Sequence, residues 1–196
     1  VATITDAVVA VDDEYGDRMA TGSSRGPNSP VPDVIKPDVI APGSDILAAY
    51  KTPEEYNMIG GTSMASPHTA GAALLLRSLH PDWTPAMIQS ALVSTAVDDL
   101  AVKHDWTTPA DPFDMGGGRV YASNAARAGF VLDETVAGYQ AANPGAGGDP
   151  STLNLATLGQ DYCAGTCTWT RVLSSTQDAA VSWTASVVTP AGMVLT

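Results

Sequence analysis

The chain has 196 residues, 44% of them hydrophobic, so it can bury one sizeable core, or one core and a smaller module. Its formal net charge of −12, from 21 acidic and 9 basic residues, disfavours phosphate backbones and anionic membrane surfaces as partners. The longest apolar run, AGAALLL at residues 70–76, is far too short to cross a bilayer. The composition therefore excludes nucleic acid and membrane from the expected partners.

The N-terminal third is expected to consist of strands and an ordered loop. Residues 1–17 alternate apolar and polar side chains and break at a turn, which predicts a hairpin or strand pair. Residues 22–45 are rich in proline and glycine, which exclude helix and predict an ordered loop with a short strand. A further short strand is predicted at 56–59, ending at two glycines. Val1 in place of an initiator methionine is typical of a piece of a longer chain.

Two helices follow. Residues 63–79 are small or apolar on every side and predict a buried helix that ends near Pro81. Thr84 and Pro85 are typical of an N-cap and a first-turn proline, so a second helix is expected to begin there. Its polar face places it nearer the surface.

The remainder is divided by composition. Residues 98–118 are predicted to be loop, and the first module is assigned to residues 1–140. Glycine and proline make 141–151 a linker. Residues 152–196 carry Thr, Val and Trp at period two in two runs, 166–175 and 179–189, which predicts antiparallel sheet.

Ser63 is the candidate nucleophile. A glycine turn that delivers a serine to the first turn of a buried helix exposes its hydroxyl and directs backbone amides at whatever binds there. Those amides and the positive end of the helix dipole favour an oxyanion. The alternative is that Ser63 or Thr62 only caps the helix.

The sequence motifs around Ser63 resemble those of the subtilisin-like serine proteases. Five motifs follow one another in the order of that family's catalytic domain, namely SSRGP, KPDVIAPG, ILAAY, GTSMASPH and HPDWTPAMIQSALVSTA. The resemblance implies an α/β fold, a three-layer parallel sheet with a buried central helix, present here in part. It assigns Ser63 as the catalytic serine, with its own N–H as one oxyanion donor. The other residues that support this motif are Gly61, Thr62, Met64, Ala65, Pro67 and His68.

The catalytic triad of Asp, His and Ser is not complete within this chain. In the family its order is Asp, His, Ser, whereas His68, His80 and His104 all follow Ser63. Five residues along a helix place His68 roughly 140° and roughly 7.5 Å from Ser63. His68 is therefore expected to be structural, His80 to cap a helix end, and His104 to be solvated. Asp38 is interpreted as structural. By resemblance, the triad Asp and His and the oxyanion asparagine lie on an N-terminal segment that these residues lack.

The two ends of the chain resemble further modules of such proteases. Residues 1–21 look like the return from an inserted protease-associated domain, or equally like a direct continuation of the catalytic sheet. Residues 152–196 resemble the start of a fibronectin type III-like β-sandwich. A complete sandwich needs roughly 100 residues, so this one is expected to be truncated, with unpaired strand edges.

Cys163 and Cys167 are the only cysteines. A short-range disulfide is favoured for a secreted protein, and two free buried thiols are the alternative. No further His or Cys lies near enough for a zinc site, so no metal ligand is assigned. The family resemblance makes calcium possible, without ligands, and no other cofactor is implied.

The leading hypothesis is a portion of a secreted serine endopeptidase that hydrolyses polypeptide substrates through Ser63 and is inactive as an isolated chain. The alternative is a non-catalytic interaction fragment that binds a partner or carbohydrate. A serine hydrolase of another class ranks last, since GTSMA lacks the second glycine of the G-x-S-x-G motif found in esterases.

Overall fold

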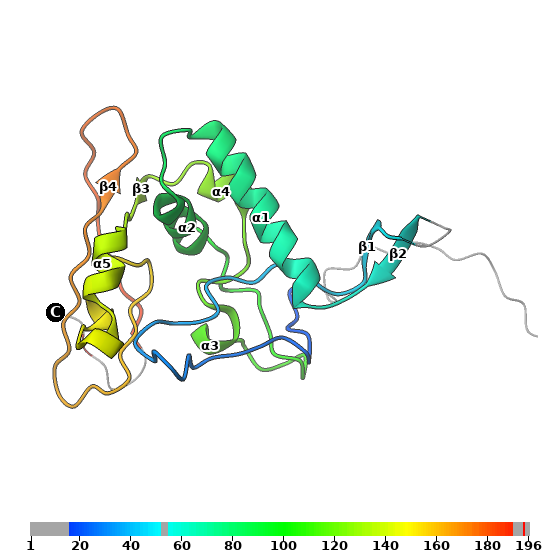
Figure 1. Ribbon diagram of the computed structural model, residues 1–196, viewed down its shortest axis with the longest axis horizontal. Helices are drawn as coiled ribbons and strands as arrows, with labels where there is room; N and C mark the ends of the chain where they lie inside the picture. Colours follow the sequence, from blue (N-terminus) through cyan, green and yellow to red (C-terminus); the bar gives the residue numbers. More distant parts are fainter. Residues whose placement is uncertain (1–15, 52–54, 190–193, 195–196) are drawn as a thin grey trace, which may run out of the picture.

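The computed structural model describes residues 16–51, 55–189 and 194. Two helices, α1 (Thr62–Leu79) and α2 (Pro85–Ser94), form its centre, and shorter elements surround them. Figure 1 shows α1 running along one side of the body, with α2 beside it and the C-terminal segment on the opposite side. The strand pair expected at residues 1–17 lies almost wholly outside the described residues.

A β-hairpin precedes α1 and projects from the body (Figure 1). Strand β1 (Ile46–Ala49) pairs antiparallel with β2 (Tyr56–Ile59), so that Ile46 lies opposite Ile59. The predicted strand at 56–59 is confirmed, and it ends at Gly60 and Gly61 as expected.

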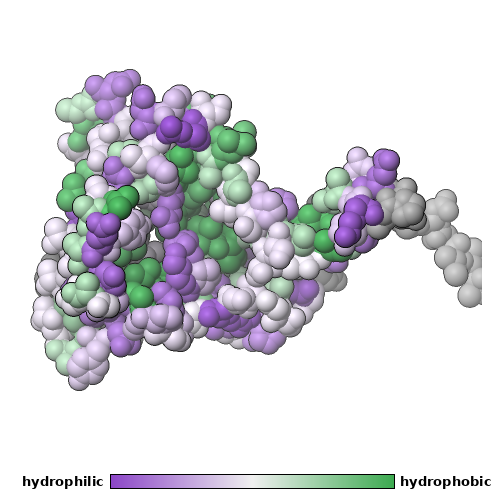
Figure 2. Space-filling model, in the orientation of Figure 1, coloured by the Kyte–Doolittle hydropathy of each residue, from purple (hydrophilic) through white to green (hydrophobic). Residues whose placement is uncertain are grey.

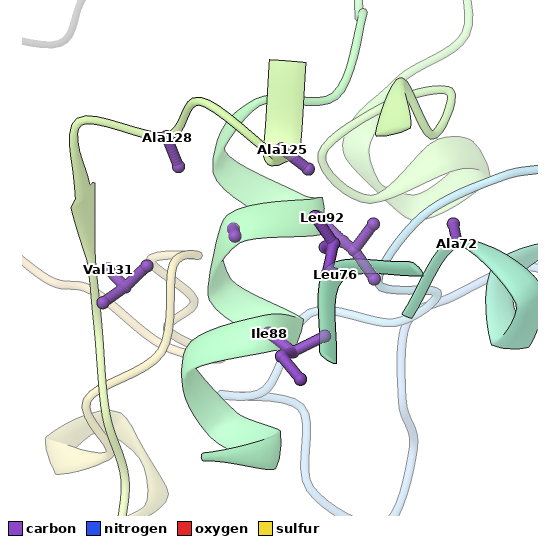
Figure 3. Packing of buried hydrophobic residues seen from close by; sticks show 8 residues of the cluster. Ala72, Leu76, Ile88, Leu92, Ala125, Ala128 and Val131 are labelled. Carbon is purple, nitrogen blue, oxygen red and sulfur yellow. The ribbon is translucent and has the colours of Figure 1, made fainter. Parts of the chain in front are cut away.

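The core lies where α1 and α2 meet α4 (Ala122–Ala125) and β3 (Phe130–Val131). Leu76 of α1 is 1% exposed and is the largest fully buried side chain among the described residues. Figure 3 shows how the cluster converges on α2, with α1 on one side and the segment that leads into β3 on the other. The buried members are Ala72, Leu76, Ile88, Ala91, Leu92, Ala125, Ala128 and Val131.

The burial of the two helices is the reverse of the prediction. On α1 only Ala72 and Leu76 are buried, and Leu74 is 70% exposed. On α2 half of the residues are buried, namely Ile88, Ser90, Ala91, Leu92 and Val93. An apolar helix is buried only where other elements cover it, and within the described part of the chain α1 is covered along one side. Figure 2 shows apolar surface over the region of α1.

The start of α2 follows the sequence signal. Thr84 is the N-cap, and its hydroxyl accepts a hydrogen bond of 3.1 Å from the N–H of Met87. Pro85 occupies the first helical position, where its missing N–H costs nothing.

The expected parallel sheet is not formed by the residues that the structure describes. Parallel pairing occurs at two isolated bridges, Arg18 with Val102 and Ile40 with Arg119. The two named sheets are both antiparallel pairs of strands. A parallel strand needs neighbours reached through crossover connections, and these segments meet at single residues only.

The loop after α2 is held by ionic contacts around α3 (Pro112–Met115). Asp114 is 2% exposed and forms ion pairs with Arg25 at 3.2 Å and Lys103 at 2.9 Å. Asp111 caps α3, and its N–H donates back to Asp114 in a capping box. A buried carboxylate with two cationic partners fixes this loop against residue 25.

The same loop supplies a prediction for pH titration. A hydrogen bond from the Thr108 hydroxyl, with backbone N–H bonds from Thr108 and Thr107, lowers the pKa of Asp105 to about 2. We expect Thr108→Ala to raise this pKa, and Thr107→Ala, which keeps the backbone donor, to leave it near 2. Carbon-detected NMR titration of the Asp105 carboxyl measures both.

The direction of the stability effect follows from the depressed pKa. Asp105 stabilises the folded chain fully above its unfolded pKa of about 3.9, and this contribution is lost as pH falls toward about 2. An unchanged pKa in Thr108→Ala would contradict the assignment.

The predicted strands of the C-terminal segment are mostly wrong. Of the runs 166–175 and 179–189, only β4 (Ser174–Ser175) forms a strand, and it pairs antiparallel with β3 of the first module. The other residues lack a partner strand among those described, and period-two alternation does not create one. A fibronectin-like sandwich is therefore not seen.

Side-chain hydrogen bonds to the backbone hold this segment instead. The Arg171 guanidinium donates to the carbonyls of Leu155 at 2.8 Å, Thr157 at 3.1 Å and Ser151 at 3.2 Å. The Asn154 side chain bonds Asp133 and Val172. The stretch assigned to a linker, 141–151, contains the end of α5 (Val136–Ala141) and 3₁₀ turns at Pro144–Ala146 and Pro150–Thr152.

Candidate active site

Ser63 is the second residue of α1 and is exposed. Strand β2, two glycines and α1 follow one another without a gap, so a strand–turn–helix presents this serine. Gly61 has a φ of 151°, a region that favours glycine, and its N–H donates to the carbonyl of Gly43 at 2.7 Å. Its carbonyl accepts from the N–H of Met64 at 2.9 Å.

The N-cap position falls on Gly61, which has no side chain. Neither Thr62 nor Ser63 is therefore the capping residue, which removes the alternative role considered for the hydroxyl. The first backbone amides of a helix have no acceptor within it and lie at the positive end of its dipole. The Ser63 N–H is one of them, so one residue carries both an exposed hydroxyl and an N–H at the positive end of the helix dipole.

Pro67 lies inside α1, four residues after Ser63. Because proline has no N–H, the Ser63 carbonyl lacks the usual donor from the next turn. Of the other motif residues, Met64 and Ala65 are half-buried, whereas Thr62 and Gly61 are exposed.

All three histidines lie within the described residues, and each faces a group other than Ser63. His68 Nδ1 donates to the carbonyl of Met64 at 2.8 Å, and its ring is exposed instead of packed beneath the helix. The expected structural role is thus limited to its own helix.

The other two histidines are further along the chain. His80 is the C-cap of α1, donates from Nε2 to the Ala126 carbonyl at 3.0 Å and stacks on Trp83. His104 is exposed and accepts from Arg25 at 3.3 Å. The described residues thus bring Ser63 together with no histidine. Among the described residues the Ser63 hydroxyl also has no hydrogen bond to a carboxylate, and Asp38 accepts hydrogen bonds from Lys36 and Gln89.

The remaining predicted features concern cysteines, metals and membranes. Cys163 and Cys167 form a disulfide. Within the described residues no group of three or more His, Cys, Asp or Glu side chains is placed to hold a metal ion. None of the helices among them is long and apolar enough to span a bilayer.

Comparison with known proteins gives the family. The sequence profile of the Subtilase family matches residues 3–130. The chain belongs to this family, whose members are serine-type peptidases.

Similar curated proteins come from Arabidopsis thaliana. The subtilisin-like protease SBT3.4 is 45% identical over 134 residues, which are 63% of this chain and 17% of that protein. The subtilisin-like protease SBT3.6 is 41% identical over 149 residues, or 71% of this chain and 19% of that protein. The chain thus spans less than a fifth of the length of these relatives.

Solved structures are also similar, and one of them is a bacterial enzyme. Fervidolysin from Fervidobacterium pennivorans, a keratinolytic enzyme related to subtilisin, is 26% identical with a TM-score of 0.39, covering 46% of this chain and 15% of its own.

Sequence reasoning missed the role of Gly43. Its carbonyl accepts a hydrogen bond from the Gly61 N–H, and its α-carbon lies against the start of α1. The proline–glycine pair that ends KPDVIAPG marks a turn, but the contact joins residues eighteen apart and has no local signal.

Proposed function

We propose that the chain is a portion of a secreted subtilisin-like serine endopeptidase that hydrolyses peptide bonds through an acyl-enzyme on Ser63. The observation that carries this proposal is the exposed serine on the first turn of α1, preceded by a glycine turn, in a chain of the Subtilase family. The C-terminal part of the catalytic domain is then residues 1–140, and the residues after the 141–151 linker are the start of a fibronectin type III-like module whose sandwich does not form among the described residues.

The chemistry of Ser63 requires a base. Its Oγ attacks the scissile carbonyl while a histidine accepts the hydroxyl proton, and the tetrahedral oxyanion accepts a hydrogen bond from the Ser63 N–H. The histidine then protonates the leaving amine, and water releases the acyl group by the reverse transfers. Since none of the three histidines faces Ser63, we assign the base, its Asp partner and the oxyanion asparagine to residues outside this chain.

The exposed side of α1 supports that assignment. Leu74 and Leu75 are 70% and 63% exposed. A helix with such a side gains stability when another apolar surface covers it. We propose that the N-terminal catalytic segment covers this side of α1 and brings the base to Ser63. An unrelated binding partner on the same side is the alternative, in which the chain is a non-catalytic fragment.

Acyl-enzyme trapping tests the proposed function. The complete protease, made from its full coding sequence, is mixed with an activated ester of a short peptide and quenched in acid. We expect an acyl group on the tryptic peptide that contains Ser63, and none after Ser63→Ala. Hydrolysis of the ester with no acylated peptide, or with acylation elsewhere, would exclude Ser63 as the nucleophile.

A further inference from the structure

The backbone around Gly43 is in close contact with the turn before Ser63. The Gly43 carbonyl accepts the Gly61 N–H at 2.7 Å. A Cβ added at Gly43 would lie 2.8 Å from the Gly61 carbonyl oxygen and 3.2 Å from the Ala65 Cβ. A contact below 3.0 Å requires movement, and here the neighbouring atom is a backbone oxygen, which cannot rotate away as a side chain can.

The Gly61 carbonyl oxygen, which would be displaced, also accepts hydrogen bonds from the first turn of α1. The Gly61 carbonyl accepts from the N–H of Met64 at 2.9 Å and of Ala65 at 3.4 Å. Ser63 lies between Gly61 and Met64 in this turn. A shift of the Gly61 carbonyl therefore moves the backbone that carries both the Ser63 hydroxyl and the Ser63 N–H.

We propose that Gly43 is a positioning residue for the nucleophile: its lack of a side chain lets residues 43 and 61 approach, and this contact fixes the first turn of α1 and with it Ser63. The inference rests on the proposed function, because positioning matters only if Ser63 reacts. Misplacing a reacting group by about 1 Å costs on the order of a hundredfold in rate.

The chain offers a graded series of identical substitutions. Gly43→Ala meets backbone at 2.8 Å, and Gly60→Ala meets the Gly43 carbonyl at 3.2 Å and the Ser44 Cα at 3.4 Å. Gly22→Ala meets nothing within 4 Å, lies outside α1 and is the matched control. All three substitutions add one methyl group, and they differ in what that group touches.

The test uses the complete protease and two measurements, kcat and KM on a quenched fluorescent peptide, and the rate and final stoichiometry of labelling by a fluorophosphonate. For Gly43→Ala we expect kcat to fall about tenfold to a hundredfold, with KM changed less than about twofold. Labelling should be slower by a similar factor yet reach the wild-type stoichiometry. Gly60→Ala should show a smaller loss, and Gly22→Ala none.

The outcomes separate positioning from folding and from function. A Gly43→Ala enzyme that labels at the wild-type rate but to a lower stoichiometry is partly unfolded, and the inference fails. It fails also if Gly43→Ala matches Gly22→Ala in a protease whose wild type is active. If the wild type itself is neither active nor labelled, the proposed function fails, and the inference with it.

Discussion

Replacing Ser63 with alanine is expected to lower kcat of the complete protease by on the order of a million-fold, as for loss of the serine from a Ser-His-Asp triad. The substitution removes the only atom that can form the acyl-enzyme, whereas the bound substrate contacts other residues, so KM should change little. Steady-state hydrolysis of a quenched fluorescent peptide measures both constants.

A control separates loss of the nucleophile from loss of structure. Ser94 is exposed at the end of α2, so Ser94→Ala makes the same chemical change on the neighbouring helix. We expect this variant to keep wild-type kcat. Because Ser63 is exposed and Gly61 is the N-cap, Ser63→Ala should also unfold at the wild-type urea concentration. A Ser63→Ala protease that retains most of its activity would show that another residue is the nucleophile.

Replacing Leu76 with alanine is expected to destabilise the 196-residue chain by about 2 to 5 kcal/mol. Leu76 is 1% exposed in the cluster between α1 and α2, and truncation leaves a cavity there in addition to the lost apolar burial. The neighbouring Leu75 is 63% exposed, so Leu75→Ala makes the same change on the same helix at a cost of about 0.5 kcal/mol or less. Equilibrium urea unfolding gives both values.

The same pair of variants tests what covers α1. In the complete protease the N-terminal catalytic segment is proposed to pack on the side that carries Leu75. Leu75→Ala should then become costly, approaching the range of Leu76→Ala. Equal and large costs in the 196-residue chain would instead mean that both sides of α1 are already buried. A small cost for Leu75→Ala in both proteins would contradict the proposed packing.

Local signals in the sequence predicted local structure well. The N-cap and first-turn proline at Thr84 and Pro85 placed the start of α2, and the two glycines placed the end of β2 and the start of α1. These features depend on backbone geometry within a few residues, and nearby side chains determine it. The position of Ser63 on the first turn followed from the same signals.

Burial and sheet pairing could not be predicted in this way, because they depend on partners far along the sequence. The apolar composition of α1 indicated burial, yet Leu74 and Leu75 are exposed where no described element covers them. The Thr- and Val-rich run at 179–189 has the right alternation for a strand and forms none. The contact between Gly43 and Gly61 likewise joins two turns that the hairpin separates.

The most direct test compares fluorophosphonate labelling of the folded 196-residue chain with labelling of the complete protease, followed by peptide mapping. We expect one adduct on Ser63 in the complete protease and none in the 196-residue chain, because we assign the base that activates this serine to residues outside the chain. Labelling of Ser63 in the isolated, folded chain would contradict the account, since a base would then be present among residues 1–196.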